Sequence, residues 1–328
     1  MITTAGQLTT ADYIGSVPAL LGIFPDETVT LIFVRRGRIA MVVDAALDQD
    51  RAGFAAHIAA VAAERHLEAV QIVVVARTNR ASEALTFADL ITAQLDTHAI
   101  TLIGRAYTHQ LQRGASWTDL DTYHVGTIPD PATTAVAVAA ITEGRVLLAA
   151  RHDLIARYTL AATPDPETRR VARADSARPS FAATTLRELA RIVATGAHPS
   201  AELAARLEIM VTISHPARTA MLGVAAIDPR AAAEVLTEAA NQMRDIPRAH
   251  LLAAVALLHY ITGYGVASYE AVTHAREAAR TARTEIRSLI EFVAVAHERI
   301  IPIEFVRPML TQGRHAALKF GIEVPDFS

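Results

Sequence analysis

Residues 17–44 read VPALLGIFPDETVTLIFVRRGRIAMVVD, and they carry the clearest structural signal in the chain. Two segments within them, 29–34 and 39–43, are rich in β-branched residues and apolar at consecutive positions, as in strands buried on both faces. Residues 35–38 join the two segments, and Gly37 can take the backbone angles of a tight hairpin turn. We therefore expect a β-hairpin in the interior of a sheet.

Strand and helix patterns alternate after this hairpin. Residues 52–65 and 82–95 place apolar side chains at helical spacing, whereas 69–76 and 100–107 are short apolar runs typical of strands. Successive strands separated by helices need crossover connections, which join parallel strands. The pattern predicts an α/β domain with a mixed, mainly parallel sheet, at least three parallel strands and flanking helices.

The second half of the chain has a purely helical pattern. From residue 180 onward we find no strand signal, and helix starts recur at prolines, which fit the first turn of a helix; these are Pro199, Pro216, Pro229, Pro247 and Pro302. Residues 161–179 hold three prolines and four arginines without apolar periodicity, as expected of a linker. We predict an α/β domain at 1–160, a linker or crossing segment at 161–183 and an α-helical domain at 184–328.

The amino-acid composition argues against several classes of functional site and of protein. The chain has 328 residues, a net charge of −3 and no cysteine, so disulfides, thiolate nucleophiles and cysteine-ligated metals are excluded. The slightly acidic balance argues against a protein that mainly neutralises phosphate backbones. The N-terminus lacks the pattern of a signal peptide, and the apolar run at 251–258 is too short to span a bilayer. We expect a soluble, cytoplasmic protein without membrane association.

The opening VPALLGIFPDETV, with GTIPDP at 126–131 and RHDL at 151–154, resembles a family of uncharacterised actinobacterial proteins classed as a domain of unknown function. Members open with VPxLLGxxPxxSxV and share a strand ending in Arg-x-Asp-Leu and an Ala-rich helical C-terminal part. Thr28 stands here at the family's serine. Of Arg-x-Asp-Leu only Asp44 is kept, with Val42 and Ala45 at the other two positions. The resemblance implies no activity.

The loop before the first strand holds two candidate ligand-binding residues. Asp26 and Thr28 could face a ligand at the edge of the sheet. Alternatively, either side chain bonds its own backbone, as short polar side chains do in turns. Gly22 and Pro25 would shape this turn, and Gly126 and Pro131 are structural candidates of the same kind.

Asp44 lies at the end of an apolar strand, where α/β sheets commonly place ligand-binding groups. A partly buried carboxylate there needs a partner, and Arg151 is our first choice, with Arg105 the second. The alternative is that Asp44 caps the following turn. Together with Asp130, these residues define a candidate site formed by Asp26, Thr28, Asp44, Asp130 and Arg151.

Other chemistry finds little support. Thirteen histidines are present, but none is spaced as metal ligands are, so we expect no metal site. No nucleotide-binding glycine motif or nucleophile elbow occurs, so no cofactor is implied.

Three functional hypotheses remain. The first is a non-catalytic binding or regulatory protein whose helical half holds a partner chain or a second copy. The alternative is a small-molecule enzyme, a hydrolase or transferase, with its site around Asp44. The third is nucleic-acid binding through the arginines of 161–183, which carboxylates interrupt.

Overall fold

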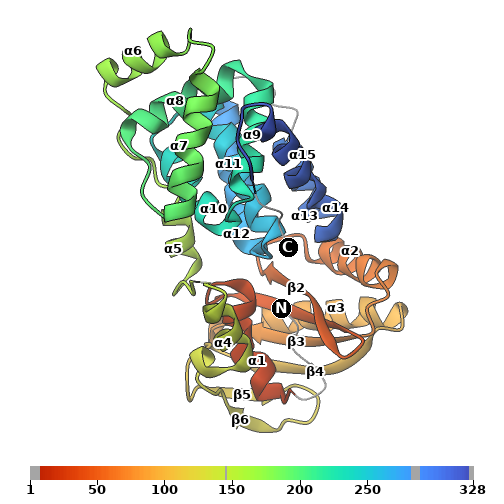
Figure 1. The fold of residues 1–328 in the computed structure, drawn as a ribbon. Coiled ribbons are helices and arrows are strands. Elements are labelled where there is room, and N and C mark those ends of the chain that lie inside the picture. The colour runs from red at the N-terminus through yellow and green to blue at the C-terminus, as the bar shows by residue number, and fades with distance from the viewer. Residues whose placement is uncertain (1–7, 145, 282–288, 325–328) are drawn as a thin grey trace. The chain divides into compact units, whose positions relative to one another are not determined.

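The computed structural model of the chain describes residues 8–144, 146–281 and 289–324, which fall into two compact units, Met1–Asp153 and Leu154–Ser328 (Figure 1). The first is an α/β unit and the second a helical unit. The predicted order, a mixed sheet with helices followed by a helical region, is confirmed. The division falls at 153/154, before the segment 161–183, and that segment contains helix α6.

The α/β unit is built on one six-stranded sheet with the order β2-β1-β3-β4-β5-β6. Its strands are β1 (Thr28–Arg35), β2 (Arg38–Ala46), β3 (Ala69–Val75), β4 (Thr101–Thr108), β5 (Ser116–Asp119) and β6 (Val125–Thr127). Its helices are α1 (Thr10–Leu21), α2 (Arg51–Glu64), α3 (Ala81–Thr97) and α4 (Ala135–Thr142), and α5 (Arg151–Ala156) begins at its end.

The expectation of a mainly parallel sheet is wrong. Strands β2, β3 and β4 do run in one direction, as their helical connections require, but β1 lies between β2 and β3 and is antiparallel to both. Among the described strands only β3 and β4 pair in parallel. The cause is the hairpin turn, in which Arg36 and Gly37 both have positive φ (52° and 66°), so that β1 folds directly against β2.

Helices cover both faces of the central strands. Helices α2 and α3 pack on one face and α1 on the other (Figure 1), so β1 and β3 are buried over nearly their whole length. Phe54 of α2 and Phe87 of α3 meet edge to face at 5.8 Å.

The GTIPDP segment at 126–131 has a structural role. Gly126 pairs with Trp117, and a Cβ at Gly126 would lie 2.6 Å from the indole ring. Pro129 packs against Gly15 of α1, where a Cβ would lie 3.0 Å from the proline ring. Pro131 begins a short 3-10 turn. The segment therefore packs against Trp117 in the β5–β6 pair at one end and against α1 at the other.

The helical unit contains no strand among its described residues. Its helices are α6 (Pro166–Asp175), α7 (Phe181–Thr195), α8 (Ala201–Ile213), α9 (His215–Ala225), α10 (Pro229–Asn241), α11 (Asp245–Ile261), α12 (Gly265–Thr281), α13 (Leu289–Glu298), α14 (Ile303–Val306) and α15 (Pro308–Leu318). Helix α11 is buried along most of its length and pairs with α12 as a hairpin, turned at Gly263 (φ 80°).

Helices α9 and α15 approach each other unusually closely. A Cβ at Gly223 would fall inside the van der Waals distance of the Gly313 carbonyl, and a Cβ at Gly313 would do the same at Gly223. Two facing glycines therefore set the spacing of this helix pair. In the part of the chain that the structure describes, every helix is too short or too polar to cross a lipid bilayer.

Candidate functional site

Asp44 lies beside two threonines on one face of the sheet. It pairs with Thr30 across the β1–β2 ladder, and the Thr30 hydroxyl donates a hydrogen bond of 2.8 Å to Asp44 Oδ1. Thr28, two residues earlier on β1, has its side chain on the same face. Both threonines are buried: Thr28 is 4% exposed and Thr30 0%. The Asp44 carboxylate therefore accepts a hydrogen bond across the β1–β2 ladder.

Burial raises the pKa of Asp44, while the hydroxyls of Thr30 and Thr28 and the positive charge of Arg151 oppose that rise. Arg151 reaches this region because residue 148 forms a parallel bridge with Ile23, just before β1. The structure thus brings Thr28, Asp44 and Arg151 together. Arg105, our second choice of partner for Asp44, pairs with Asp89 and Asp121 instead.

Asp44→Asn is expected to stabilise the α/β unit at pH 7. A group whose folded-state pKa lies above its unfolded value favours folding when protonated and loses that contribution as the pH rises through the folded-state pKa. The amide mimics the protonated form at every pH. Urea unfolding followed by the fluorescence of Trp117, the only tryptophan and a residue of the α/β unit, measures the effect.

The matched measurement is the same pair of proteins below pH 3.8, the ordinary pKa of the group, where the advantage of the variant should shrink. A variant less stable than the wild type at pH 7 would show instead that the carboxylate form is the one that the fold favours.

Asp26 belongs to a different, charged cluster where β3 ends and α3 begins. Its carboxylate pairs with Arg77 at 2.6 Å, and Glu27 accepts the Arg77 backbone N–H at 3.2 Å. Arg80 pairs with Asp48 at 2.7 Å and with Glu83 at 2.9 Å. Arg51 also pairs with Glu83.

These carboxylates are neutralised by arginines of the same unit. Arg77 and Arg80 were not predicted from the sequence. Both lie within five residues of the end of the buried strand β3, and that position at a strand end could have identified them.

Asp130 lies apart from both clusters. Its side chain accepts the Ala132 backbone N–H at 3.0 Å, and Arg113 is 4.0 Å away. Asp130 thereby caps the 3-10 turn that follows it. The five residues of the candidate site are therefore divided among three places in the α/β unit.

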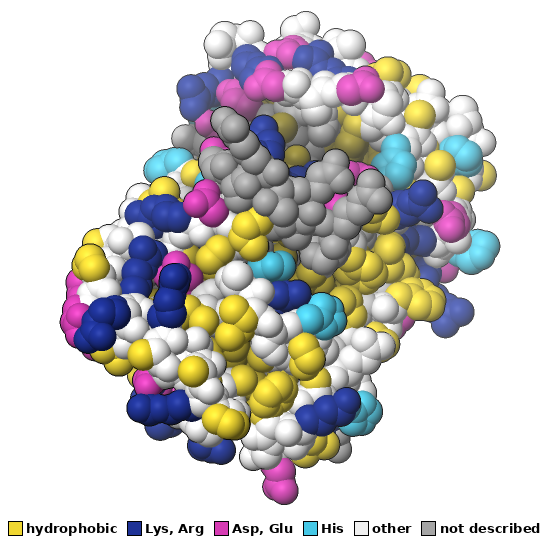
Figure 2. Space-filling model, turned by 90° about the horizontal axis from the view of Figure 1, so that it is seen from above, with side chains coloured by type: hydrophobic (Ala, Val, Ile, Leu, Met, Phe, Trp, Pro, Cys, Tyr) yellow, Lys and Arg dark blue, Asp and Glu magenta, His cyan; other side chains and the backbone are white. Residues whose placement is uncertain are grey.

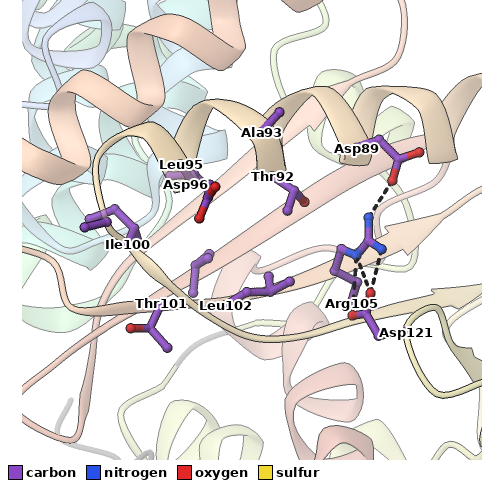
Figure 3. A pocket seen from close by; sticks show the side chains of 12 residues that line it. Asp89, Thr92, Ala93, Leu95, Asp96, Ile100, Thr101, Leu102, Arg105 and Asp121 are labelled. Carbon is purple, nitrogen blue, oxygen red and sulfur yellow. Dashed lines mark hydrogen bonds and ion pairs between the residues drawn. The ribbon is translucent and has the colours of Figure 1, made fainter.

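A groove that the sequence did not reveal runs between α3 and β4 (Figure 3). We call it the α3–β4 groove; its volume is about 520 Å³. Its lining is Val70, Asp89, Thr92, Ala93, Leu95, Asp96, Ala99, Ile100, Thr101, Leu102, Arg105 and Asp121. Val70 and Leu102, neighbours in the ladder, form the sheet side of the lining, and of the two only Leu102 is partly exposed.

A β-bulge shapes the groove. The β3–β4 register shifts so that Val70 pairs with Leu102 but Gln71 with Gly104, which leaves Ile103 as an extra residue. Leu102 and Arg105 consequently face the same side of the sheet, toward α3. Without the bulge, the three-residue spacing would place them on opposite faces.

Arg105 closes one end of the groove between two carboxylates. Its Nε and Nη2 donate to Asp121 at 3.1 and 2.6 Å, and its Nη1 donates to Asp89 on α3. The hydrogen bond to Asp121 is the main cause that raises the pKa of Arg105, against the opposing effect of burial. Asp96, also on α3, lies between the helix and the sheet in Figure 3 and, within the described residues, has no cationic partner.

Three histidines of the helical unit, one buried and two half-buried, have lowered pKa values. Burial lowers the pKa of His250 and His297 to about 4 and that of His259 to about 3. His297 Nε2 lies 2.7 Å from Ser268 Oγ, which donates to the Ala256 carbonyl at 2.6 Å. Because the hydroxyl donates its proton to that carbonyl, this arrangement pairs with the His297 tautomer that carries its proton on Nε2 and donates to Ser268.

No group of three or more potential ligand side chains that could hold a metal ion occurs in the described ranges.

Comparison with known proteins finds one family. A family model described as Domain of unknown function (DUF4192) matches residues 11–282. No curated protein and no solved structure matches the chain.

Proposed function

The chain belongs to the family described as Domain of unknown function (DUF4192), and from that premise we propose that it is a non-catalytic binding or regulatory protein of the cytoplasm. The helical unit would hold a partner chain or a second copy of this chain.

The observation that supports this proposal is a set of large apolar side chains exposed on α12, α13 and α14. Phe305 is 70% exposed, Tyr269 53%, Val295 38% and Phe292 36%. Phe292 and Val295 lie three residues apart and so share one side of α13, and the Tyr269 ring is 6.1 Å from that of His297 on the same helix. Exposed aromatic residues of this kind are typical of protein interfaces.

Light scattering coupled to gel filtration tests this function. We expect the wild-type chain to self-associate or to retain a partner identifiable by mass spectrometry, and Phe292→Ser with Phe305→Ser to weaken that association at least about tenfold, since buried aromatic anchors dominate interface energies. Val138→Ser on α4, which removes a side chain 53% exposed in the other unit, is the control. A strictly monomeric wild type that retains no chain would contradict the proposal.

A small-molecule enzyme with its site at Asp44 is the second candidate. The observation in its favour is the half-buried carboxyl of Asp44, whose pKa is raised by burial against the opposing effect of the charge of Arg151, a combination common at functional sites. Under this alternative, Asp44→Asn abolishes thermal stabilisation by the substrate but leaves association through α13 and α14 intact.

Nucleic-acid binding has less support. Arg169 pairs with Glu208, Arg170 with Glu167 and Arg178 with Asp175. Figure 2 shows basic side chains interspersed with acidic ones along the left edge of the face that it views. Such paired arginines are poor counterions for a phosphate backbone.

A further inference from the structure

The outer edge of strand β2 is an interaction surface, and we propose that it pairs with β2 of a second copy of this chain as an antiparallel strand. Among the described strands, the sheet ends at β2 on one side and at β6 on the other. Strand β2 has nine residues and β6 has three, so β2 offers much the longer edge to an added strand. This edge belongs to the α/β unit, so the inference does not rest on the exposed residues of α12, α13 and α14.

Alternate residues of β2 direct their backbone hydrogen-bonding groups away from β1. The Leu47 N–H donates to the Glu27 carbonyl at 3.2 Å, which makes these two residues a hydrogen-bonded pair at the end of the ladder. In an antiparallel ladder such pairs alternate with non-hydrogen-bonded pairs, so Val42, Asp44 and Ala46 belong to the second kind. Their N–H and C=O groups point outward, where no described strand pairs with β2. An added strand would satisfy them.

The side chains of β2 give this edge little protection. Residues 39–43 read IAMVV and contain neither a charge nor a proline, which are common devices that keep edge strands from pairing. A bulge at Ala40 interrupts the strand near its start, and Asp44 is its one carboxylate. Residues 41–46 therefore form the regular segment that is available for pairing.

The charges at the two ends of β2 make the strand complementary to itself. Arg36 and Arg38, at its start, are exposed, and within the described residues their side chains have no carboxylate partner. Asp48 and Asp50 follow its end and are exposed, although Asp48 also pairs with Arg80. An antiparallel second copy brings the arginines of each chain toward the aspartates of the other, whereas a parallel copy would bring like charges together. The charge pattern therefore favours an antiparallel copy of the same strand.

The outward backbone groups select one register. Only residues with outward groups can bond across the new ladder, so Val42 of one copy pairs with Asp44 of the other. The twofold axis then passes between the two Val43 residues, which lie opposite each other. Pairing Asp44 with Asp44 would set two carboxylates directly opposite, which is destabilising, and pairing Val42 with Val42 would bring the bulge at Ala40 into the ladder.

A single introduced thiol reports this pairing, because the chain contains no cysteine. In Val43→Cys the two thiols meet in a non-hydrogen-bonded pair, whose Cα–Cα distance of about 4.5 Å suits a disulfide. Under mild oxidation we expect its disulfide-linked dimer to form at least about tenfold faster than that of the control, because paired strands hold the thiols at a high effective concentration. The control is Val138→Cys, with its thiol on the exposed side of α4 in the same unit.

Sedimentation equilibrium tests the same edge without a covalent bond. A single added strand makes a small interface, so we expect the wild type to be mainly dimeric at about 0.2 mM chain. Val42→Pro should be monomeric there, because it removes an outward N–H while keeping the bonds of the β1–β2 ladder.

Charge reversal at the start of β2 is the second variant. Arg36→Glu with Arg38→Glu should weaken the dimer at least about tenfold, since each copy would set like charges against the other at both ends. Arg187→Glu with Arg191→Glu, the same change of charge at exposed residues of α7, should leave the dimer intact.

A monomeric wild type at that concentration, equal dimerisation by Val42→Pro, or crosslinking of Val43→Cys no faster than that of the control would each overturn the inference. A dimer that persists in Val42→Pro and is lost in Phe292→Ser with Phe305→Ser would also overturn it, and would assign self-association to the helical unit. The unfolding transition of Trp117 confirms that each variant is folded. The crosslinking comparison stands even if Val42→Pro does not fold.

Discussion

Replacing Gly223 with alanine is expected to destabilise the helical unit by about 3 kcal/mol, the upper end of the cost of overpacking. The added Cβ would overlap the backbone carbonyl of Gly313 and lie 2.5 Å from the Arg314 nitrogen. Backbone atoms cannot rotate away as a flexible side chain can. Helices α9 and α15 must therefore separate, which exposes the buried Leu310 and Ala317 of α15.

Urea unfolding followed by far-UV circular dichroism measures this loss, while Trp117 fluorescence reports the α/β unit in the same sample. Gly265→Ala is the matched control, because a Cβ at Gly265 meets no atom within 4 Å. We expect it to change stability by less than about 0.5 kcal/mol. Equal midpoints for Gly223→Ala and Gly265→Ala would show that the close approach of α9 and α15 contributes nothing to stability.

Arg248→Ala is expected to cost about 3 kcal/mol or more, because it leaves three acceptors without their donor and each buried unsatisfied acceptor costs about 1–3 kcal/mol. Arg248 is only 6% exposed. Its Nη1 donates to the Ala240 carbonyl at 2.9 Å and to Asn241 Oδ1 at 3.1 Å, and its Nη2 donates to the Tyr158 carbonyl at 2.6 Å. Removal of the guanidinium leaves these buried acceptors unsatisfied at the C-terminal end of α10.

The same unfolding measurement applies, with Arg191→Ala on α7 as the control, since Arg191 is exposed and its side chain has no partner in the described part of the chain. Arg248→Lys should recover less than half of the loss because an ammonium lacks the planar fork that reaches two helix ends at once. Full recovery by lysine would assign the effect to charge alone.

Local features of the fold could be predicted from the sequence. Gly37 marked the hairpin turn, and the apolar spacing located α2 and α3 within a few residues. The insertion of β1 between β2 and β3 could not be predicted, because the choice of pairing partner for a strand buried on both faces is not encoded in its own alternation. Helix α6 was missed since it has little apolar surface and begins with the Asp165–Pro166 pair that we assigned to a linker.

The candidate site was predictable only in part. Asp44 could be proposed from its position near the end of an apolar strand, and the charge of Arg151, our first choice of partner, does act on Asp44. The groove carried no sequence signal: Asp89 and Asp96 come from one helix, Asp121 from the turn after β5, and their approach depends on the bulge at Ile103. Asp130 bonds the backbone of its own turn, whereas the partner of Asp26 is Arg77, on the far side of the β-hairpin and β3 along the chain, which the residues around Asp26 do not indicate.

The glycine contact between α9 and α15 bears on where this chain can be cut. The family match ends at residue 282, whereas Gly313 lies beyond it. A truncated chain ending at the family boundary would lack α15 and would therefore uncover the side of α9 on which Gly223 meets Gly313. Experiments on the isolated family segment would therefore be made on a helical unit without α13, α14 and α15.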